Sequence, residues 1–168
     1  MLETFGATFF GVIGSFLLWY GGQWWLKQRK DKIAVKHIAR EIQEEISLNI
    51  NILVLCANTI PNMISGGNIP VFIPYRLNLS VHRYLTSSGE LRLVDVSQQR
   101  SILDAGMTSE SFNRFIDNTE LLLTLANGLT QPHSLVTARH RLTGLTEQAQ
   151  DTAKHLNEIL GELKGKVE

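Results

Sequence analysis

Residues 5–26 read FGATFFGVIGSFLLWYGGQWWL, an apolar run that contains no charged side chain. As an α-helix these 22 residues would extend about 33 Å, at about 1.5 Å per residue. The hydrocarbon core of a bilayer is about 30 Å thick, so the run is long enough to cross it once. The sequence therefore predicts a transmembrane anchor over residues 1–30 and a second domain, polar enough for water, over residues 31–168.

Basic residues flank only the C-terminal end of this run. Lys27, Arg29 and Lys30 follow it directly, whereas residues 1–4 contain no Lys or Arg. Because a basic flank stays on the cytoplasmic side, we expect a single-pass protein of the bacterial inner membrane with its N-terminus outside and its C-terminal domain in the cytoplasm. A cleaved signal peptide would need a basic start and a small-x-small cleavage site, and the sequence offers neither.

Aromatic residues gather at the same end of the run: Trp19, Tyr20, Trp24 and Trp25. Indole and phenol rings favour the headgroup layer, where the apolar body and the polar tip are both accommodated. We therefore expect these rings, together with Lys27, Arg29 and Lys30, to anchor the helix at the interface. The basic cluster would also attract anionic lipid, so the bilayer is the first expected partner.

Small residues repeat along the run at a spacing that places them on one helix face: Ala7, Thr8, Gly11, Ser15 and Gly22. Small residues four apart let helix backbones approach closely, which predicts self-association within the membrane. The same face could instead line a narrow water-filled lumen in a ring of helices, although no charged residue marks an ion path. A plain membrane anchor is the third interpretation, because glycine is common in membrane spans.

The composition excludes several classes of function. Sixteen basic and sixteen acidic residues give a net charge of zero, so a strong nucleic-acid footprint is absent. The single cysteine, Cys56, cannot form an internal disulfide and is expected to be a small buried apolar residue, in keeping with a reducing cytoplasm. No phosphate-binding glycine loop, GxSxG motif or CxxC pair occurs, and we expect no cofactor.

Apolar periodicity predicts helices over residues 31–58, 76–86, 96–127 and 134–164. Residues 59–75, TIPNMISGGNIPVFIPY, contain three prolines and a Gly-Gly pair, which predict a long apolar loop. In the first helix the expected core positions include Ile42, Ile46, Ile50 and Leu53. Gly106 is expected to bend the third helix.

The last helix carries the clearest pattern, with apolar and small residues at alternating steps of three and four. This seam comprises Leu135, Ala138, Leu142, Leu145, Ala149, Thr152, Leu156, Ile159 and Leu163. Its partner is either the preceding helix or the same helix of another copy. No strand alternation is evident. We therefore expect an all-α fold: one N-terminal transmembrane helix that continues into a cytoplasmic antiparallel helical bundle.

Two groups of residues are of types that could carry out chemistry. Arg76 and His82 match the R-x4-6-H spacing of HEPN ribonucleases, in which Arg stabilises phosphate charge and His moves protons. About one such match is expected by chance in this chain, and Leu77 departs from the polar residue that the HEPN pattern favours after Arg. His37 and Glu41, with Glu44 and Glu45 nearby, favour a solvated charged face over a metal site, and we expect no metal.

The layout resembles that of small single-span accessory membrane proteins of type VI CRISPR systems. The resemblance covers the span, the long helix, the segment from Arg76 to His82 and the helical remainder, and the turn at residues 88–91, SGEL, resembles one common in bacterial membrane-anchored proteins. It implies a HEPN-like bundle, homo-oligomeric rings and a pore that depolarises the inner membrane during phage infection. It also implies a protein or RNA-guided complex as activator. The alternatives are a membrane-tethered HEPN-type ribonuclease and a non-enzymatic adaptor.

Overall fold

The computed structural model describes residues 2–66, 69–70, 72–128 and 132–165, with side chains described at 18–66, 69–70, 72–126 and 136–165. All regular secondary structure in this part of the chain is helical, without strands, which confirms the predicted all-α class. The elements are α1 (Leu2–Ser65), α2 (Ser80–Ser88), the short 3-10 helix η1 (Glu90–Leu93), α3 (Val96–Gly128) and α4 (Pro132–Lys164). The chain divides into two compact units, residues 1–38 and 39–168.

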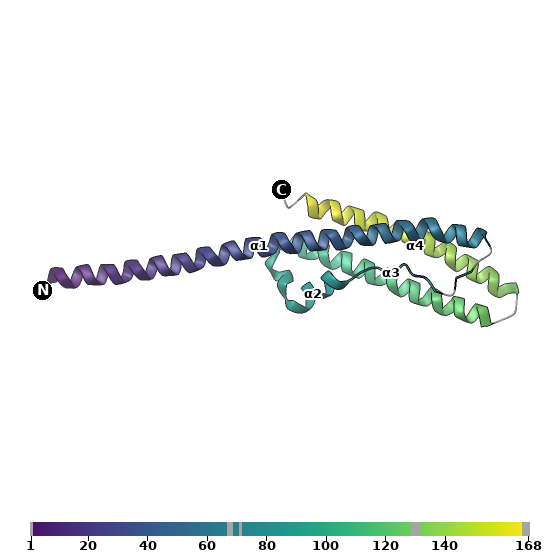
Figure 1. Cartoon of the computed structure of the whole chain (residues 1–168), viewed down its shortest axis with the longest axis horizontal. Helices are drawn as coiled ribbons and strands as arrows, with labels where there is room; N and C mark the ends of the chain where they lie inside the picture. Colours follow the sequence, from purple (N-terminus) through teal and green to yellow (C-terminus); the bar gives the residue numbers. More distant parts are fainter. Residues whose placement is uncertain (1, 67–68, 71, 129–131, 166–168) are drawn as a thin grey trace. The chain divides into compact units, whose positions relative to one another are not determined.

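The second unit is a helical bundle built on α3 and α4, which lie side by side (Figure 1). The start of α3 meets the end of α4, because Ser101 Oγ donates a hydrogen bond of 2.9 Å to Glu162 Oε2. The second part of α1 belongs to the same unit, where Gln43 Nε2 contacts the Leu163 carbonyl oxygen at 3.4 Å.

The predicted seam of α4 is confirmed as a core face. Every seam residue from Ala138 onward is buried: Ala138, Leu142, Leu145, Ala149, Thr152, Leu156, Ile159 and Leu163. Leu135 lies outside the residues whose side chains are described. The seam packs within one chain, so of the two predicted partners the intramolecular one is found.

The expected loop at residues 59–75 is wrong over its first part, because α1 runs through Pro61 to Ser65. Proline inside a helix removes one backbone hydrogen bond. Here Ile60, next to the proline, is 1% exposed in the core. Packing of this turn against the bundle thus outweighs the local preference of proline.

Residues 72–79, for which a loop and then a helix were expected, form an extended segment held by side chains of α1 and α3. The amide of Asn113 binds both backbone groups of Leu77, accepting from the N–H at 2.8 Å and donating to the carbonyl oxygen at 3.0 Å. Asn49 binds Asn78 in the same way, at 2.7 and 2.8 Å. These two amides replace the partner strand that extended backbone otherwise needs.

Helix α2 begins at Ser80, four residues later than predicted, and its N-terminus is capped by Glu45 of α1. The Glu45 carboxylate accepts hydrogen bonds from the N–H groups of Val81 at 2.7 Å and His82 at 3.2 Å. Because Glu45 is buried, its assignment to a solvated face is wrong. The sequence could not show this cap, since the acceptor lies 36 and 37 residues before the two donors.

We predict that Asn49→Leu destabilises the second unit, although Leu suits a buried helix position. Asn49 is 2% exposed, and its loss would leave both backbone groups of Asn78 without their partner. The expected cost is about 2–3 kcal/mol, which corresponds to a midpoint lower by roughly 4–10 °C in thermal unfolding followed by circular dichroism. Asn51→Leu, at an exposed position of the same helix, is the control and should change stability by less than about 0.5 kcal/mol. Equal midpoints for the two variants would contradict a stabilising role for the hydrogen bonds between Asn49 and Asn78.

The expected burial of Cys56 is confirmed, since its side chain is fully buried. Burial raises the pKa of the thiol to about 12. At pH 8 only roughly one folded molecule in ten thousand would then carry the reactive thiolate. We therefore predict that iodoacetamide modifies Cys56 only when the bundle opens, at a rate that rises steeply with denaturant. Labelling of the native protein as fast as that of a free thiol would contradict the packing.

Candidate functional site

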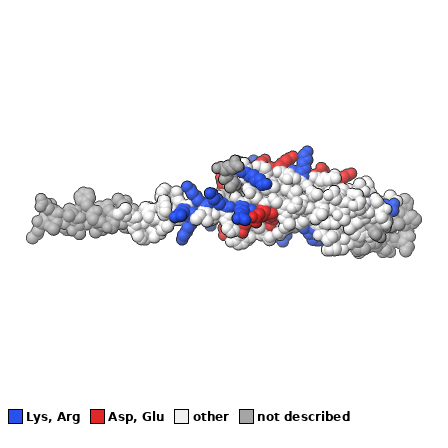
Figure 2. All heavy atoms as spheres, turned by 45° about the horizontal axis from the view of Figure 1, so that its top comes forward, with Lys and Arg blue, Asp and Glu red and all other residues white. Residues whose placement is uncertain are grey.

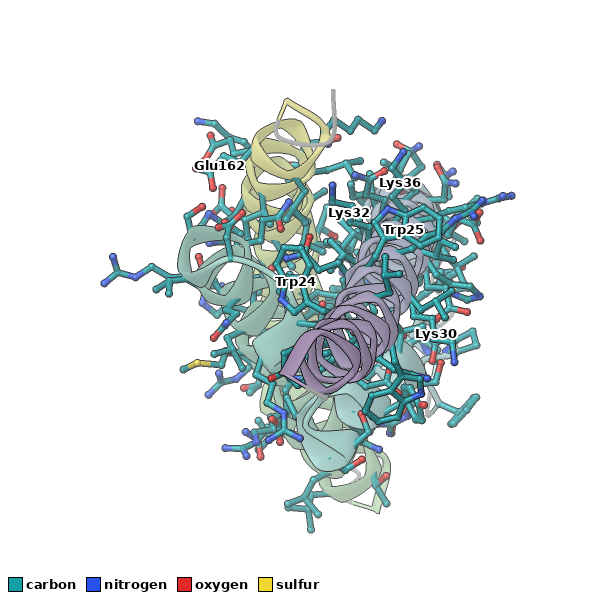
Figure 3. The ribbon with its side chains drawn as sticks, turned by 90° about the vertical axis from the view of Figure 1, so that its left-hand side faces the viewer. Trp24, Trp25, Lys30, Lys32, Lys36 and Glu162 are labelled. Carbon is teal, nitrogen blue, oxygen red and sulfur yellow. The ribbon has the colours of Figure 1, made fainter. Side chains whose placement is uncertain are left out.

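The first unit exposes an apolar and aromatic segment at residues 18–26. Leu18 is 81% exposed, and Trp24 and Trp25 are 58% and 56% exposed, with Trp19, Tyr20 and Leu26 also exposed. In Figure 3 Trp24 and Trp25 point to different sides of α1. A helix that is apolar on all sides is normally surrounded by protein or lipid. Among the described residues, one stretch of helix, Leu18–Ser65 of α1, is long and apolar enough to cross a membrane by length and composition, a test that the core helix of a soluble protein also passes.

A basic segment follows directly. Lys27, Arg29, Lys30, Lys32 and Lys36 are all exposed, and Asp31 is the only acidic residue among them. Figure 2 shows Lys and Arg side chains gathered on the helix after an uncharged section. The Arg29 guanidinium lies over the Trp25 ring, 5.5 Å from its centroid, at cation–π distance.

Of the predicted small-residue face, Gly22 is described and the side chains of Thr8, Gly11 and Ser15 lie outside the described residues. A Cβ built on Gly22 meets no atom within 4 Å. This position is therefore open to a second helix or to lipid.

In the second unit, Arg76 lies in the extended segment and is held by two carboxylates of α3. It forms ion pairs with Asp117 and, at 2.8 Å, with Glu120. The hydrogen bond to Asp117 is the main cause of a raised pKa of Arg76. Glu120 also accepts a hydrogen bond from the Ile73 N–H at 2.6 Å, so the pair fastens the segment to α3. The guanidinium is thus already neutralised where a nuclease would need it for phosphate.

His82, the other half of the ribonuclease-like pair, packs against α3 at Gly106. A Cβ built on Gly106 would lie 2.0–2.3 Å from three atoms of the His82 ring, so only glycine admits the ring here. The Nδ1 atom of His82 is buried without a hydrogen-bond partner in the described structure. Gly106 was expected to bend α3, whereas the structure gives it a packing role.

A polar groove of about 540 Å³ lies beside Arg76, between the extended segment, α2 and α3. Its charged lining comprises Arg76, Arg83, Arg114, Glu110 and Asp117. Arg114 is paired with Glu110 at 2.9 Å. Most of the charge in the groove is therefore compensated within the protein, and His82 is not among the lining residues. Across the described residues, no group of three or more His, Cys, Asp or Glu side chains could hold a metal ion.

No protein-family model, curated protein or solved structure matches this chain.

We predict that Gly106→Ala destabilises the bundle through His82. The new methyl group would push the imidazole off α3, at a cost of about 1–3 kcal/mol in the free energy of unfolding. Gly144→Ala is the matched control on α4, where a Cβ meets nothing within 4 Å, and it should stabilise by up to about 1 kcal/mol.

The decisive comparison is a double-mutant cycle, measured by denaturant unfolding. In a His82→Ala background the steric conflict is gone, so Gly106→Ala should lose most of its cost. If Gly106→Ala lowers the free energy of unfolding equally in the presence and absence of the imidazole, the His82 ring is not the reason that glycine is required at position 106.

Proposed function

We propose that this chain is a single-span membrane protein that holds its helical bundle at the cytoplasmic surface and acts as a homo-oligomer. The exposed apolar segment at residues 18–26 is the observation that carries the proposal. Soluble monomers rarely expose large contiguous apolar surfaces, and lipid satisfies such a surface on all sides of a helix. Residues 5–17, which precede the segment, contain no charged residue either.

The orientation follows from the charge flank. All five Lys and Arg residues of positions 27–36 lie on the C-terminal side of the apolar run, and residues 1–4 have none. By the positive-inside tendency the N-terminus crosses the bacterial inner membrane and the bundle stays in the cytoplasm.

Self-association is supported by the spacing of Thr8, Gly11, Ser15 and Gly22, which places small residues on one face of α1. Spans that gather through this face around an axis would form a pore, and its opening would leak ions across the membrane. The architectural resemblance to type VI CRISPR accessory proteins is what links this activity to antiviral defence and to an RNA-guided activator.

A non-enzymatic role is proposed because Arg76 is engaged by Asp117 and Glu120, and because the groove beside it is not lined by His82. An adaptor is the second candidate, and one observation favours it. The start of α3 exposes Val96, Leu103 and Met107 on one face, and an exposed apolar stripe of this kind is typical of docking surfaces.

The mass of the detergent-solubilised complex tests the proposal. We expect a defined assembly of many identical chains that releases a dye from liposomes, and we expect Gly11→Leu to abolish both properties. Leucine at this position would keep neighbouring backbones apart. Gly6→Leu is the matched control, because helix geometry places residue 6 on the opposite face.

Three outcomes would decide against the proposal. Release by carbonate washing would remove the membrane span, and lone copies in detergent would remove the oligomer. A stable complex with a different protein at fixed stoichiometry would favour the adaptor.

A further inference from the structure

The basic residues after the apolar segment do not form a ring around α1. At 100° per residue, Arg29, Lys32 and Lys36 fall within about 40° of the direction of Trp25. Lys27 and Lys30 lie on the other side, about 140–200° from Trp25. Figure 3 agrees, because Trp25, Lys32 and Lys36 point to one side of α1 and Lys30 points elsewhere. We refer to Trp25, Arg29, Lys32 and Lys36 as the cationic face.

From this face we infer a binding site for anionic phospholipid headgroups, an inference that rests on the membrane span proposed above. Trp25 fixes the height of the face, since an indole ring favours the boundary between acyl chains and headgroups. The Arg29 guanidinium is held over that ring. Arg29, the cation nearest to Trp25, is therefore held at the level where lipid phosphates lie.

The cations of this face have no competing partner within the described part of the chain. Neither Arg29 nor Lys32 nor Lys36 forms an ion pair with a described carboxylate, and all three are exposed. Asp31, the nearest acid, is about 100–160° from them around the helix. The face thus offers uncompensated charge of one sign to a ligand of the opposite sign.

Distances along the helix explain why several headgroups can be bound. Arg29 lies about 6 Å beyond Trp25, Lys32 about 10 Å and Lys36 about 16 Å. The headgroup layer of one leaflet is roughly 5–8 Å thick, so Arg29 lies within it and the two lysines reach it by their flexible side chains or by tilting of the helix. The cationic face would bind anionic lipid on one side of α1 only, whereas basic residues distributed evenly around the helix would bind it on all sides.

Quenching of tryptophan fluorescence by brominated lipids tests this directly, because all three Trp residues lie at positions 19, 24 and 25. The full chain would be reconstituted in phosphatidylcholine vesicles that contain brominated phosphatidylglycerol or, separately, brominated phosphatidylcholine at the same mole fraction. We expect roughly fivefold enrichment of the anionic lipid near the indole rings, and loss of this enrichment at high salt. Excess inorganic phosphate at constant ionic strength should not compete.

Two variants that lose the same charge separate a face from a general attraction. Arg29→Gln with Lys32→Gln should bring the enrichment close to onefold, whereas Lys27→Gln with Lys30→Gln should leave most of it. Equal losses in both variants, or equal quenching by the two lipids in the parent chain, would overturn the cationic face while the membrane span stands. Absence of quenching by either lipid would overturn the span and the face together.

Discussion

Buried peptide groups must be hydrogen-bonded, and across residues 72–79 the bundle meets this requirement with side chains instead of a sheet. Asn49 and Asn113 each bind both the N–H and the carbonyl of one residue, Asn78 and Leu77 respectively. Glu120 takes the N–H of Ile73. This set of contacts fixes the extended segment between α1 and α3. Helix α2 follows directly at Ser80, so these contacts also fix where it begins.

The need of buried polar groups for partners also explains why residues that resemble catalytic groups in the sequence have structural roles here. Arg76 forms ion pairs with two carboxylates of α3, one of which also accepts a hydrogen bond from the backbone of Ile73. The Glu45 carboxylate lies at the N-terminus of α2, where the N–H groups and the helix dipole favour negative charge. His82 follows immediately and is packed against Gly106. A spacing of Arg and His suggested a nuclease, but spacing alone carries no information about which groups already have partners.

The sequence predicted the parts of the fold that depend on repeated patterns. The seam of α4 and the start of α3 at Val96 follow from periodicity and match the structure. Single decisive contacts escaped prediction, because their partners are distant in the chain. Asn49 is buried where the pattern favoured Ile50, since it binds Asn78, which lies 29 residues later. Pro61 is helical because Ile60 packs in the core, and Gly106 is required by an imidazole from another helix. In the first unit, the apolar run and its basic flank are evident in the sequence. The placement of Arg29, Lys32 and Lys36 on the same side of the helix as Trp25 follows only when helix geometry is applied.

The two apolar parts of α1 show how the distribution of apolar residues around a helix determines which surroundings suit it. Between residues 39 and 65 the buried apolar positions recur on one face, and Glu44, Asn51 and Asn58 are exposed, so the bundle covers one face of this part of the helix. Between residues 18 and 26 no polar face exists apart from Gln23, and side chains are exposed on every side. A protein partner on one side would leave the rest in water, whereas a bilayer, or a bilayer shared with further copies of the span, surrounds the helix completely. In the membrane span proposed above, the abrupt change to Lys27 and the basic residues after it would mark the end of the apolar surroundings.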